Sequence, residues 1–276
     1  MRTLLAGIAT AVVVALSSLG PSHAAALPLA PDPVEPVAGI PAPCPITHSW
    51  PGDDAPIEAV TAALSQNFGF ALTGTQWTEA SRGSIKILWQ TLDAVQCTGY
   101  VTQLQAKVNG NVAINADSKS GFAWGDWSLT KPNHVTMDFS KFQLALDSGD
   151  DGRLARLVTH EMAHVWNSDR HSEPAYWKYF QQLYAHEGNF SDYAGSSVTE
   201  TFADVVGYYV GRCALENPYD TDKHAAYYEF AKTYVFGGKE FGPAPGQLFV
   251  CEVPDSDVDT LVLPTPTIQG WIEALS

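Results

Sequence analysis

Apolar side chains recur at helical spacing along much of the chain. Residues 57–66 have this spacing, and so do residues 84–94, where Leu88 and Leu92 fall on one side of the expected helix. From Asp150 onward the pattern is mostly helical, and this aspartate can start a helix. The later part of the chain therefore predicts helices over about residues 153–168, 173–186, 196–214, 223–235 and 266–275.

A period of two residues, typical of a strand, occurs before the helical part. Residues 134–139 alternate, with Val135, Met137 and Phe139 pointing to one side, and predict a strand. Residues 121–127 are rich in Gly and Trp and predict an edge strand or a loop. Because strands come first and helices follow, the sequence predicts an α+β domain, with a small mixed sheet followed by a mainly helical half.

The first residues have the features of a secretory signal peptide over residues 1–24. Arg2 gives a positive start, an apolar run follows from Leu4 to Leu16, and small residues precede the expected cleavage point. A membrane span needs about 20 apolar residues, so this run is too short for an anchor. No later segment has the pattern of a span. The sequence therefore predicts a secreted chain without a membrane span.

The segment after the signal peptide, residues 25–45, is rich in Pro and Ala and predicts an extended spacer. A folded domain is then expected over residues 46–276. The whole chain has 276 residues and a formal net charge of -15. Because nucleic-acid phosphates are bound through Lys and Arg, this acidity argues against a nucleic-acid partner, and it argues equally against an anionic membrane surface.

Four cysteines, Cys44, Cys97, Cys213 and Cys251, suggest two disulfides in an exported chain. The pairing of Cys44 with Cys97 and of Cys213 with Cys251 is favoured because each closes a modest loop. Spacing alone leaves the other two pairings open. None of the four belongs to a C-x-x-C pair, so a cysteine-based metal or redox site is not indicated.

The segment from Val158 to Trp166 contains the motif H-E-x-x-H, at His160, Glu161 and His164. Positions i and i+4 of a helix lie on one face, so both histidines can bind one metal ion. Glu161 lies about 100° around the helix, within reach of a water at that metal. The apolar side chains of this helix form a separate stripe, which predicts a distinct core face. The alternative is two surface histidines beside a solvated glutamate.

A catalytic zinc site needs a third protein ligand and an open position for water. His171 is near in sequence, but the metzincin spacing requires His at position 170 and Gly at position 167, where this chain has Arg170 and Asn167. Asp169 lies one position too early for the variant of that pattern with Asp. We therefore expect His171 to be a surface residue beyond the helix.

The helical stretch over residues 196–214 supplies a better third ligand. Glu200 and Asp204 are four residues apart and share a face. Glu200 can bind the metal, and Asp204 can accept a hydrogen bond from the other ring nitrogen of a ligating histidine. The alternative is an amphipathic helix with exposed acids, which the upstream H-E-x-x-H disfavours. Two histidines and one glutamate favour a single zinc ion as the cofactor.

Together, H-E-x-x-H and E-x-x-A-D resemble the motifs of the gluzincin clan of zinc metallopeptidases, in particular the family of the anthrax lethal factor catalytic domain and related secreted bacterial proteins. The resemblance covers roughly residues 120–215 and implies a zincin-like metallopeptidase domain. That family has a tyrosine seven residues before the Glu ligand, here Tyr193, and the resemblance implies that Tyr193 stabilises the oxyanion or protonates the leaving amine. The family has Glu where this chain has Asp204, so the contact to the histidine differs in reach.

The motif and the resemblance favour a secreted zinc metalloendopeptidase with Glu161 as general base and a peptide or protein as substrate. An extended substrate is expected to add to an edge strand near residues 122–127 or 134–139. Trp124 and Trp127 are candidates to line the cleft, and a packing role in the core or in a loop is the alternative. Three alternatives stay open: an exported zinc protein that binds a partner or a cell-wall component without cutting it, an amidase acting on peptidoglycan peptides, and a toxin. The sequence sets no expectation for the oligomeric state.

Overall fold

The computed structural model describes residues 43–195, 197–247, 249 and 251, all of which lie in the unit Glu35–Ser276. The predicted signal peptide, nearly all of the Pro- and Ala-rich segment and the predicted helix over residues 266–275 lie outside the described residues. The described part of the chain combines eight α-helices with one four-stranded sheet. The predicted α+β class is therefore confirmed.

Side-chain caps determine where three of the helices begin. Asp138, Asp150 and Ser197 each accept a hydrogen bond from a first-turn backbone N–H, which satisfies a donor that the helix itself leaves unpaired. The helices are α1 (Ile57–Phe68), α2 (Arg82–Ala94), α3 (Tyr100–Lys107), α4 (Phe139–Asp147), α5 (Asp151–Trp166), α6 (Ala175–Glu187), α7 (Val198–Val210) and α8 (Ala225–Phe230), which continues as a π-helical segment, Ala231–Val235. Short 3-10 segments are Glu79–Ser81, Gln96–Thr98, Ser168–Ser172 and Pro218–Asp220.

The sheet is mixed and has the strand order β1-β2-β4-β3. Its strands are β1 (Ala71–Gly74), β2 (Ala113–Ala116), β3 (Gly125–Ser128) and β4 (Lys131–Met137). The first two and β4 are parallel, whereas β3 runs antiparallel to β4 and forms an edge. Ile114 and Val135 are buried on one face, and Thr73 and Asn115 form a hydrogen bond on the exposed face. The sheet therefore packs on one side only.

Most predicted elements are present with shifted ends. The predicted helices over residues 57–66, 84–94, 153–168, 173–186, 196–214 and 223–235 correspond to α1, α2, α5, α6, α7, and α8 with its π-helical extension. Helix α7 ends at Val210, earlier than predicted, and Gly211 follows. Residues 121–127 contain most of β3, so the edge-strand alternative is confirmed there.

The predicted strand over residues 134–139 extends too far. Strand β4 stops at Met137, because Asp138 accepts a hydrogen bond from the N–H of Ser140 and starts α4. Phe139 still points into the core, which explains why it continued the apolar alternation. The sequence pattern did not predict β1, β2, α3 or α4, and the two strands have four residues each, too few for a clear period. Helices α1 to α3 also stand among the strands, so the sheet does not precede all of the helices.

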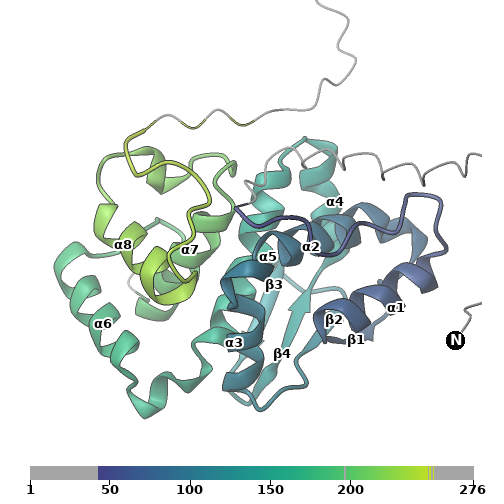
Figure 1. Cartoon of the computed structure of the whole chain (residues 1–276), viewed down its shortest axis with the longest axis horizontal. Coiled ribbons are helices and arrows are strands. Elements are labelled where there is room, and N and C mark those ends of the chain that lie inside the picture. The colour runs from purple at the N-terminus through teal and green to yellow at the C-terminus, as the bar shows by residue number, and fades with distance from the viewer. Residues whose placement is uncertain (1–42, 196, 248, 250, 252–276) are drawn as a thin grey trace, which may run out of the picture. The chain divides into compact units, whose positions relative to one another are not determined.

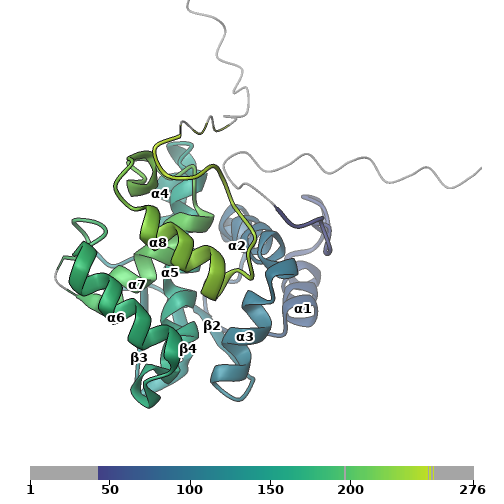
Figure 2. The same ribbon diagram turned by 60° about the vertical axis from the view of Figure 1, so that its left-hand side comes forward.

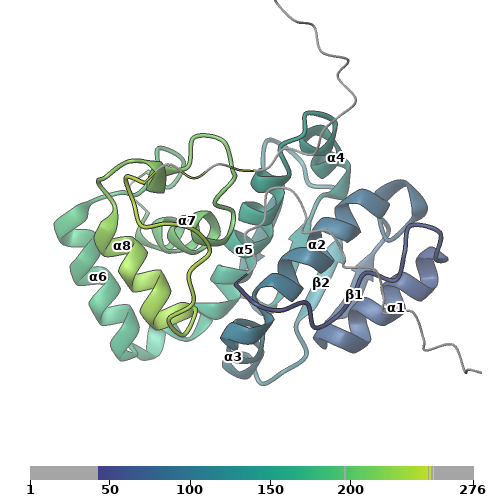
Figure 3. The same ribbon diagram turned by 45° about the horizontal axis from the view of Figure 1, so that its top comes forward.

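Helix α5 lies between the sheet and the later helices. It contacts β3 and β4 on one side and α2, α3, α4 and α7 on others, and Figure 1 shows it between the strands and α7. Figure 2 shows α6, α7 and α8 side by side, and Figure 3 shows that α6 and α8 lie beyond α7, away from the strands. The predicted apolar stripe of α5, Leu154, Val158, Met162 and Val165, is buried. The helix therefore anchors both halves of the described chain.

Two glycines allow α7 to approach α5 closely. A Cβ atom at Gly207 would lie 2.8 Å from the carbonyl oxygen of Arg156 and 3.2 Å from the Cβ of His160. A Cβ atom at Gly211, one turn later, would lie 2.6 Å from the Cβ of Arg156. Ordinary side chains would therefore overlap the neighbouring backbone, and only glycine permits this helix-to-helix distance.

Both favoured disulfides, Cys44–Cys97 and Cys213–Cys251, are formed. The first joins the start of the described chain to the segment after α2, and the second joins the segment after α7 to the end of the described chain. Two disulfides are typical of a protein from an oxidising, extracellular environment. Every helix in the described ranges is too short or too polar to cross a membrane.

Replacing Gly207 with Ala is expected to lower the free energy of unfolding by about 1–3 kcal/mol, because the new methyl group meets backbone atoms of α5. Urea unfolding followed by circular dichroism measures this change. Gly83→Ala in α2 is the matched control, since its methyl group would meet only the end of the Leu146 side chain, and helix propensity favours Ala by about 0.5–1 kcal/mol. Equal effects of the two substitutions would contradict close packing of α7 on α5.

Candidate metal centre

Three side chains from two helices converge at the surface of α5. His160 and His164 come from α5 and Glu200 from the first turn of α7, and one donor atom from each lies within 4.8 Å of the others. The Nε2 atoms of the two histidines lie 3.3 Å and 3.5 Å from Oε2 of Glu200. The imidazole rings meet edge to face with their centroids 5.0 Å apart. The structure thus brings together all three predicted ligands.

The donor set of this group fits a metal ion. Two imidazole nitrogens and one carboxylate oxygen are ligands that zinc accepts in catalytic sites. Both histidines are buried, whereas the Glu200 side chain is 35% exposed, so one side of the group opens toward solvent. Nδ1 of His160 is occupied by a hydrogen bond to Asp204, which leaves its Nε2 for the metal. The group of His160, His164 and Glu200 could therefore hold one ion.

Asp204 orients the first histidine from behind. This carboxylate is fully buried and accepts a hydrogen bond of 2.8 Å from Nδ1 of His160. The guanidinium of Arg156 and the hydroxyl of Ser191 also donate to it. Burial is the largest single effect and works against the charged carboxylate, but the hydrogen bonds from His160 and Ser191 and the positive charges of His160 and Arg156 together lower the pKa of Asp204. The predicted partner is therefore ionised and connected to three donors, one of them the ligand histidine.

The electrostatics of the group favour a positive charge. Burial opposes the charged imidazolium of His160, but its hydrogen bonds with Asp204 and Glu200 outweigh burial and raise the pKa of His160 to about 9. The hydrogen bonds from His160 and His164 lower the pKa of Glu200. Asp204 and Glu200, which stabilise a proton on His160, would also attract a metal cation, because the proton and the metal ion each bring positive charge to the same place.

Glu161 follows the first histidine but is not one of the three converging side chains. It is 7% exposed, and burial raises the pKa of its carboxyl group. Gly125 of β3 lies against it so closely that a Cβ atom there would overlap the carboxylate. A glycine in the edge strand therefore makes room for this buried acid at the floor of the cleft.

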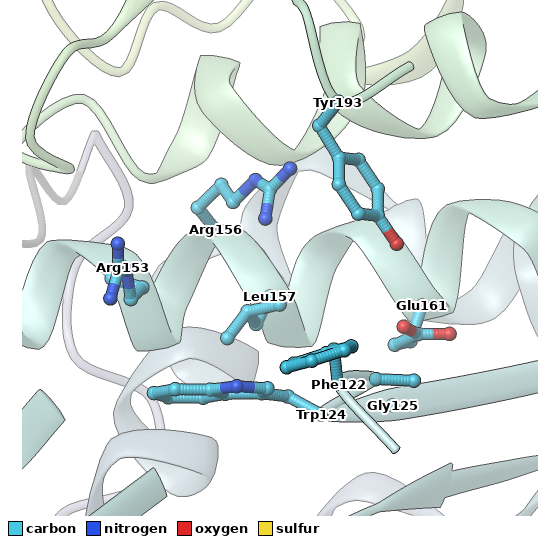
Figure 4. Close-up of a pocket in the computed structure, with 9 residues that line it drawn as sticks. Phe122, Trp124, Gly125, Arg153, Arg156, Leu157, Glu161 and Tyr193 are labelled. Atoms are coloured by element: carbon cyan, nitrogen blue, oxygen red, sulfur yellow. The ribbon is translucent and has the colours of Figure 1, made fainter. Parts of the chain in front are cut away.

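Tyr193 stands on the opposite side of the cleft from the edge strand. Its ring centroid lies 5.8 Å from that of His160, and its side chain is exposed. Figure 4 shows its hydroxyl group pointing toward Glu161. The guanidinium of Arg156 lies 5.3 Å from the tyrosine ring and supports it from the side of α5. The tyrosine singled out by the resemblance is thus adjacent to the ligand group.

The cleft consists of two adjoining pockets. One, of about 500 Å³, is lined by the three ligand side chains together with Asp126, Trp127, Arg170 and others. The second, of about 330 Å³, extends along α5 toward its N-terminal end. Both share Glu161 and Tyr193 in their lining. A ligand bound at the metal centre can therefore extend into the second pocket.

The sequence did not predict some of the contacts around the candidate metal centre. Trp127 was a candidate to line the cleft or to pack in the core or a loop; it lines the cleft and also stacks on His164, with the ring centroids 5.6 Å apart and the rings 10° from parallel. The guanidinium of Arg170 lies 5.2 Å from the centre of the Trp127 indole ring. Arg156, which pairs with Asp204, precedes His160 by one helical turn, and that spacing was its only signal.

The two residues rejected as ligands because of their spacing, His171 and Asp169, lie outside the group. His171 is exposed and does not belong to the converging set. Asp169 instead accepts hydrogen bonds from Lys107, at 2.9 Å and 2.8 Å, and from the hydroxyl of Tyr176. Neither residue near the metzincin position therefore contributes to the group of three converging side chains.

Zinc is expected to raise the free energy of unfolding by about 2.7 kcal/mol when free zinc is a hundredfold above the dissociation constant. Glu200→Gln is expected to remove most of this gain, because it replaces a charged ligand of the group. His171→Ala changes an exposed histidine outside the group and is expected to keep the gain. Thermal unfolding with and without zinc measures the effect, and a gain that survives Glu200→Gln but not His171→Ala would contradict the assignment.

Asp204→Asn is expected to weaken zinc binding by about 10–100-fold, because the neutral amide holds the ring of His160 less firmly. Competition with a chromophoric chelator measures the affinity, and circular dichroism verifies that the variant is folded. Asp220→Asn is the matched control, since Asp220 also pairs with an arginine, Arg212, but lies outside the site. Unchanged zinc affinity in folded Asp204→Asn protein would show that this contact does not support the ligand.

Comparisons of the chain with protein-family models, with curated proteins and with solved structures found no match. The assignment of the site therefore rests on its own residues. These are two histidines one helical turn apart, a carboxylate from a second helix, and a buried glutamate beside them in an open cleft.

Proposed function

We propose that this protein is a secreted zinc-dependent metallopeptidase with a zincin-like fold and a gluzincin-type site. The observation that carries the proposal is the convergence of His160, His164 and Glu200 beside Glu161 in an open cleft. Purely structural zinc sites are closed by four protein ligands. A group of three ligands that faces a pocket, with an unused acid next to it, is typical of catalysis.

His160, His164 and Glu200 would hold the ion, which supplies Lewis acidity toward a peptide carbonyl and favours deprotonation of water. The protein contributes the geometry. Asp204 keeps the ring of His160 in one orientation, and Trp127 packs flat on the ring of His164. Rigid ligands leave one face of the group for the substrate, as a hydrolytic site requires.

Glu161 is the proposed general base. Its burial raises the pKa of its carboxyl group, which makes the carboxylate a stronger base that can take a proton from water and return it to the leaving amine. It lines both pockets, so it borders any peptide that passes from one to the other. Within the described residues, the carboxylate of Glu161 forms no hydrogen bond or ion pair. The other buried carboxylate near the site, Asp204, is instead engaged by His160, Arg156 and Ser191.

Tyr193 is the proposed hydrogen-bond donor to the oxyanion. Its hydroxyl points into the cleft near Glu161 (Figure 4), from the side opposite β3. A donor there can stabilise negative charge that develops on the carbonyl oxygen. This role is the one that the resemblance to gluzincins implies, and the ring contact with His160 supports it.

The edge strand is the proposed platform for the substrate. Strand β3 pairs with β4 on one side only, and Gly125, Asp126 and Trp127 from it line the metal pocket. An extended peptide can add to such an edge through backbone hydrogen bonds. Of the two candidate segments, residues 122–127 include most of the edge strand, whereas residues 134–139 include part of inner strand β4. The two disulfides support an extracellular place of action.

Glu161→Gln is expected to lower the rate of casein cleavage by the zinc-loaded protein by about 10²–10⁴-fold, because the amide cannot accept the proton. Zinc binding should persist, since Glu161 is not a ligand of the group. Release of acid-soluble peptides measures cleavage, and a chelator should stop it in the wild type. Glu229→Gln, which makes the same change at an exposed acid of α8 outside the cleft, serves as the matched control and is expected to keep the wild-type rate.

Equal cleavage by wild-type and Glu161→Gln protein would exclude the general-base role. If neither protein cuts casein although both bind one zinc ion, general proteolysis is wrong. Cleavage of peptidoglycan peptides by the wild type alone would then favour the amidase alternative, and no cleavage of either substrate would favour the non-catalytic alternative.

A further inference from the structure

The part of the second pocket beyond Glu161 and Tyr193 is not used by the chemistry described above. It extends from Glu161 along α5, with Leu157 at its floor. Figure 4 shows Trp124 and Phe122 on one side, Arg156 and Tyr193 on the other, and Arg153 at the end farthest from Glu161. Its volume of about 330 Å³ is sufficient for one large substrate side chain.

The apolar wall of this pocket is held in place from behind. The loop that carries Phe122 is bound by the ammonium group of Lys141, which donates to three backbone carbonyl oxygens, those of Lys119 at 2.8 Å, Gly121 at 2.9 Å and Ala123 at 2.6 Å. One cation that binds three carbonyls fixes the course of the loop. The backbone of this wall is therefore held by contacts within the protein itself.

The far end of the pocket carries a guanidinium with unused donors. Arg153 lies 5.6 Å from the ring of Trp124, and its side chain is 53% exposed. Its Nε lies 3.4 Å from Asp150, and its terminal nitrogens form no hydrogen bond within the described residues. Arg156 adds a second positive charge along the wall, although Asp204 partly neutralises it. Arg153 is therefore the group that can bind an incoming anion.

Positive side chains predominate in this pocket although the chain is acidic. The protein has a formal net charge of -15, yet two of the three charged side chains that line the pocket, Arg153 and Arg156, are cations, and the third is Glu161 at the end nearest the ligand group. A local positive charge in an acidic protein attracts anionic groups to one place. A guanidinium can bind both oxygens of a carboxylate, which makes a carboxylate the best match.

We propose that the second pocket is a specificity subsite for a carboxylate on an apolar stem, next to the bond that is cut. The inference rests on the proposed peptidase function. The stem lies between Trp124 and Leu157, and the carboxylate reaches Arg153. The carboxylate has two possible sources, the side chain of a substrate glutamate or the C-terminal carboxylate of a short peptide. Arg153 selects the substrate and takes no part in the reaction itself.

Peptide binding to zinc-loaded Glu161→Gln protein tests the subsite without cleavage. The probes are alanine octapeptides, blocked at both ends, with one Glu or one Gln at each position in turn, and an alanine octapeptide with a free C-terminal carboxylate. Calorimetry is expected to show about 5–10-fold tighter binding of a Glu peptide than of its Gln partner. If the peptide with the free terminus binds more tightly than the Gln peptides and the Glu peptides do not, the subsite is supported and the terminal carboxylate is identified as its ligand.

Arg153→Gln in the same background is expected to abolish the preference for the carboxylate. Lys178→Gln is the matched control, because it removes an exposed cation on α6, outside the cleft, and is expected to keep the preference. Equal binding of all peptides, or binding of none, would overturn the subsite. A preference that persists in Arg153→Gln would also overturn it, because another group would then select the carboxylate.

Cleavage by the wild-type protein separates this inference from the proposed function. If the wild type cuts peptides but the binding assay shows no preference for a carboxylate, the subsite is wrong and the peptidase proposal stands. If carboxylate peptides bind preferentially but the wild type cuts none of them, the subsite is supported and the peptidase proposal fails.

Discussion

The close contact between α5 and α7 is the constraint on which the candidate metal centre depends. Gly207 and Gly211 let the two backbones approach to a distance that any side chain would prevent. The same approach places Glu200 beside both histidines of α5. Because a metal ion binds its ligands at about 2 Å, a small outward shift of α7 would remove its carboxylate from the group. The packing of α7 on α5 and the grouping of the three candidate ligands therefore depend on the same close approach of the two helices.

The interior of this contact contains charge, which a protein core tolerates only when the charge is paired. Asp204 is fully buried and is connected to His160, Arg156 and Ser191. The arginine of this set also lies 4.7 Å from the ring of Tyr208. The network satisfies the carboxylate, and it also holds the ring of His160 with its Nε2 toward the group that could bind a metal. Stability and preorganisation thus come from the same hydrogen bonds.

The sheet contributes to the cleft through its edge strand. Gly125 in β3 leaves space for the buried carboxylate of Glu161, and Trp127 in the same strand stacks on His164. The glycine and the indole on the side of this strand that faces α5 therefore shape the surroundings of both Glu161 and His164. The two pockets meet at this point, where Glu161 lines both of them, whereas the proposed selectivity depends on Arg153 at the far end of the second pocket.

The sequence by itself determined the features that depend on helix periodicity and on composition. Residues four apart share a face of any helix, so the pairs His160–His164 and Glu200–Asp204 were predictable, as were most helices and the α+β class. Tertiary structure alone decided that these two faces meet, that Arg156 joins the buried carboxylate and that β1 and β2 complete the sheet. These features are contacts between residues distant in the chain, and local spacing carries no information about them.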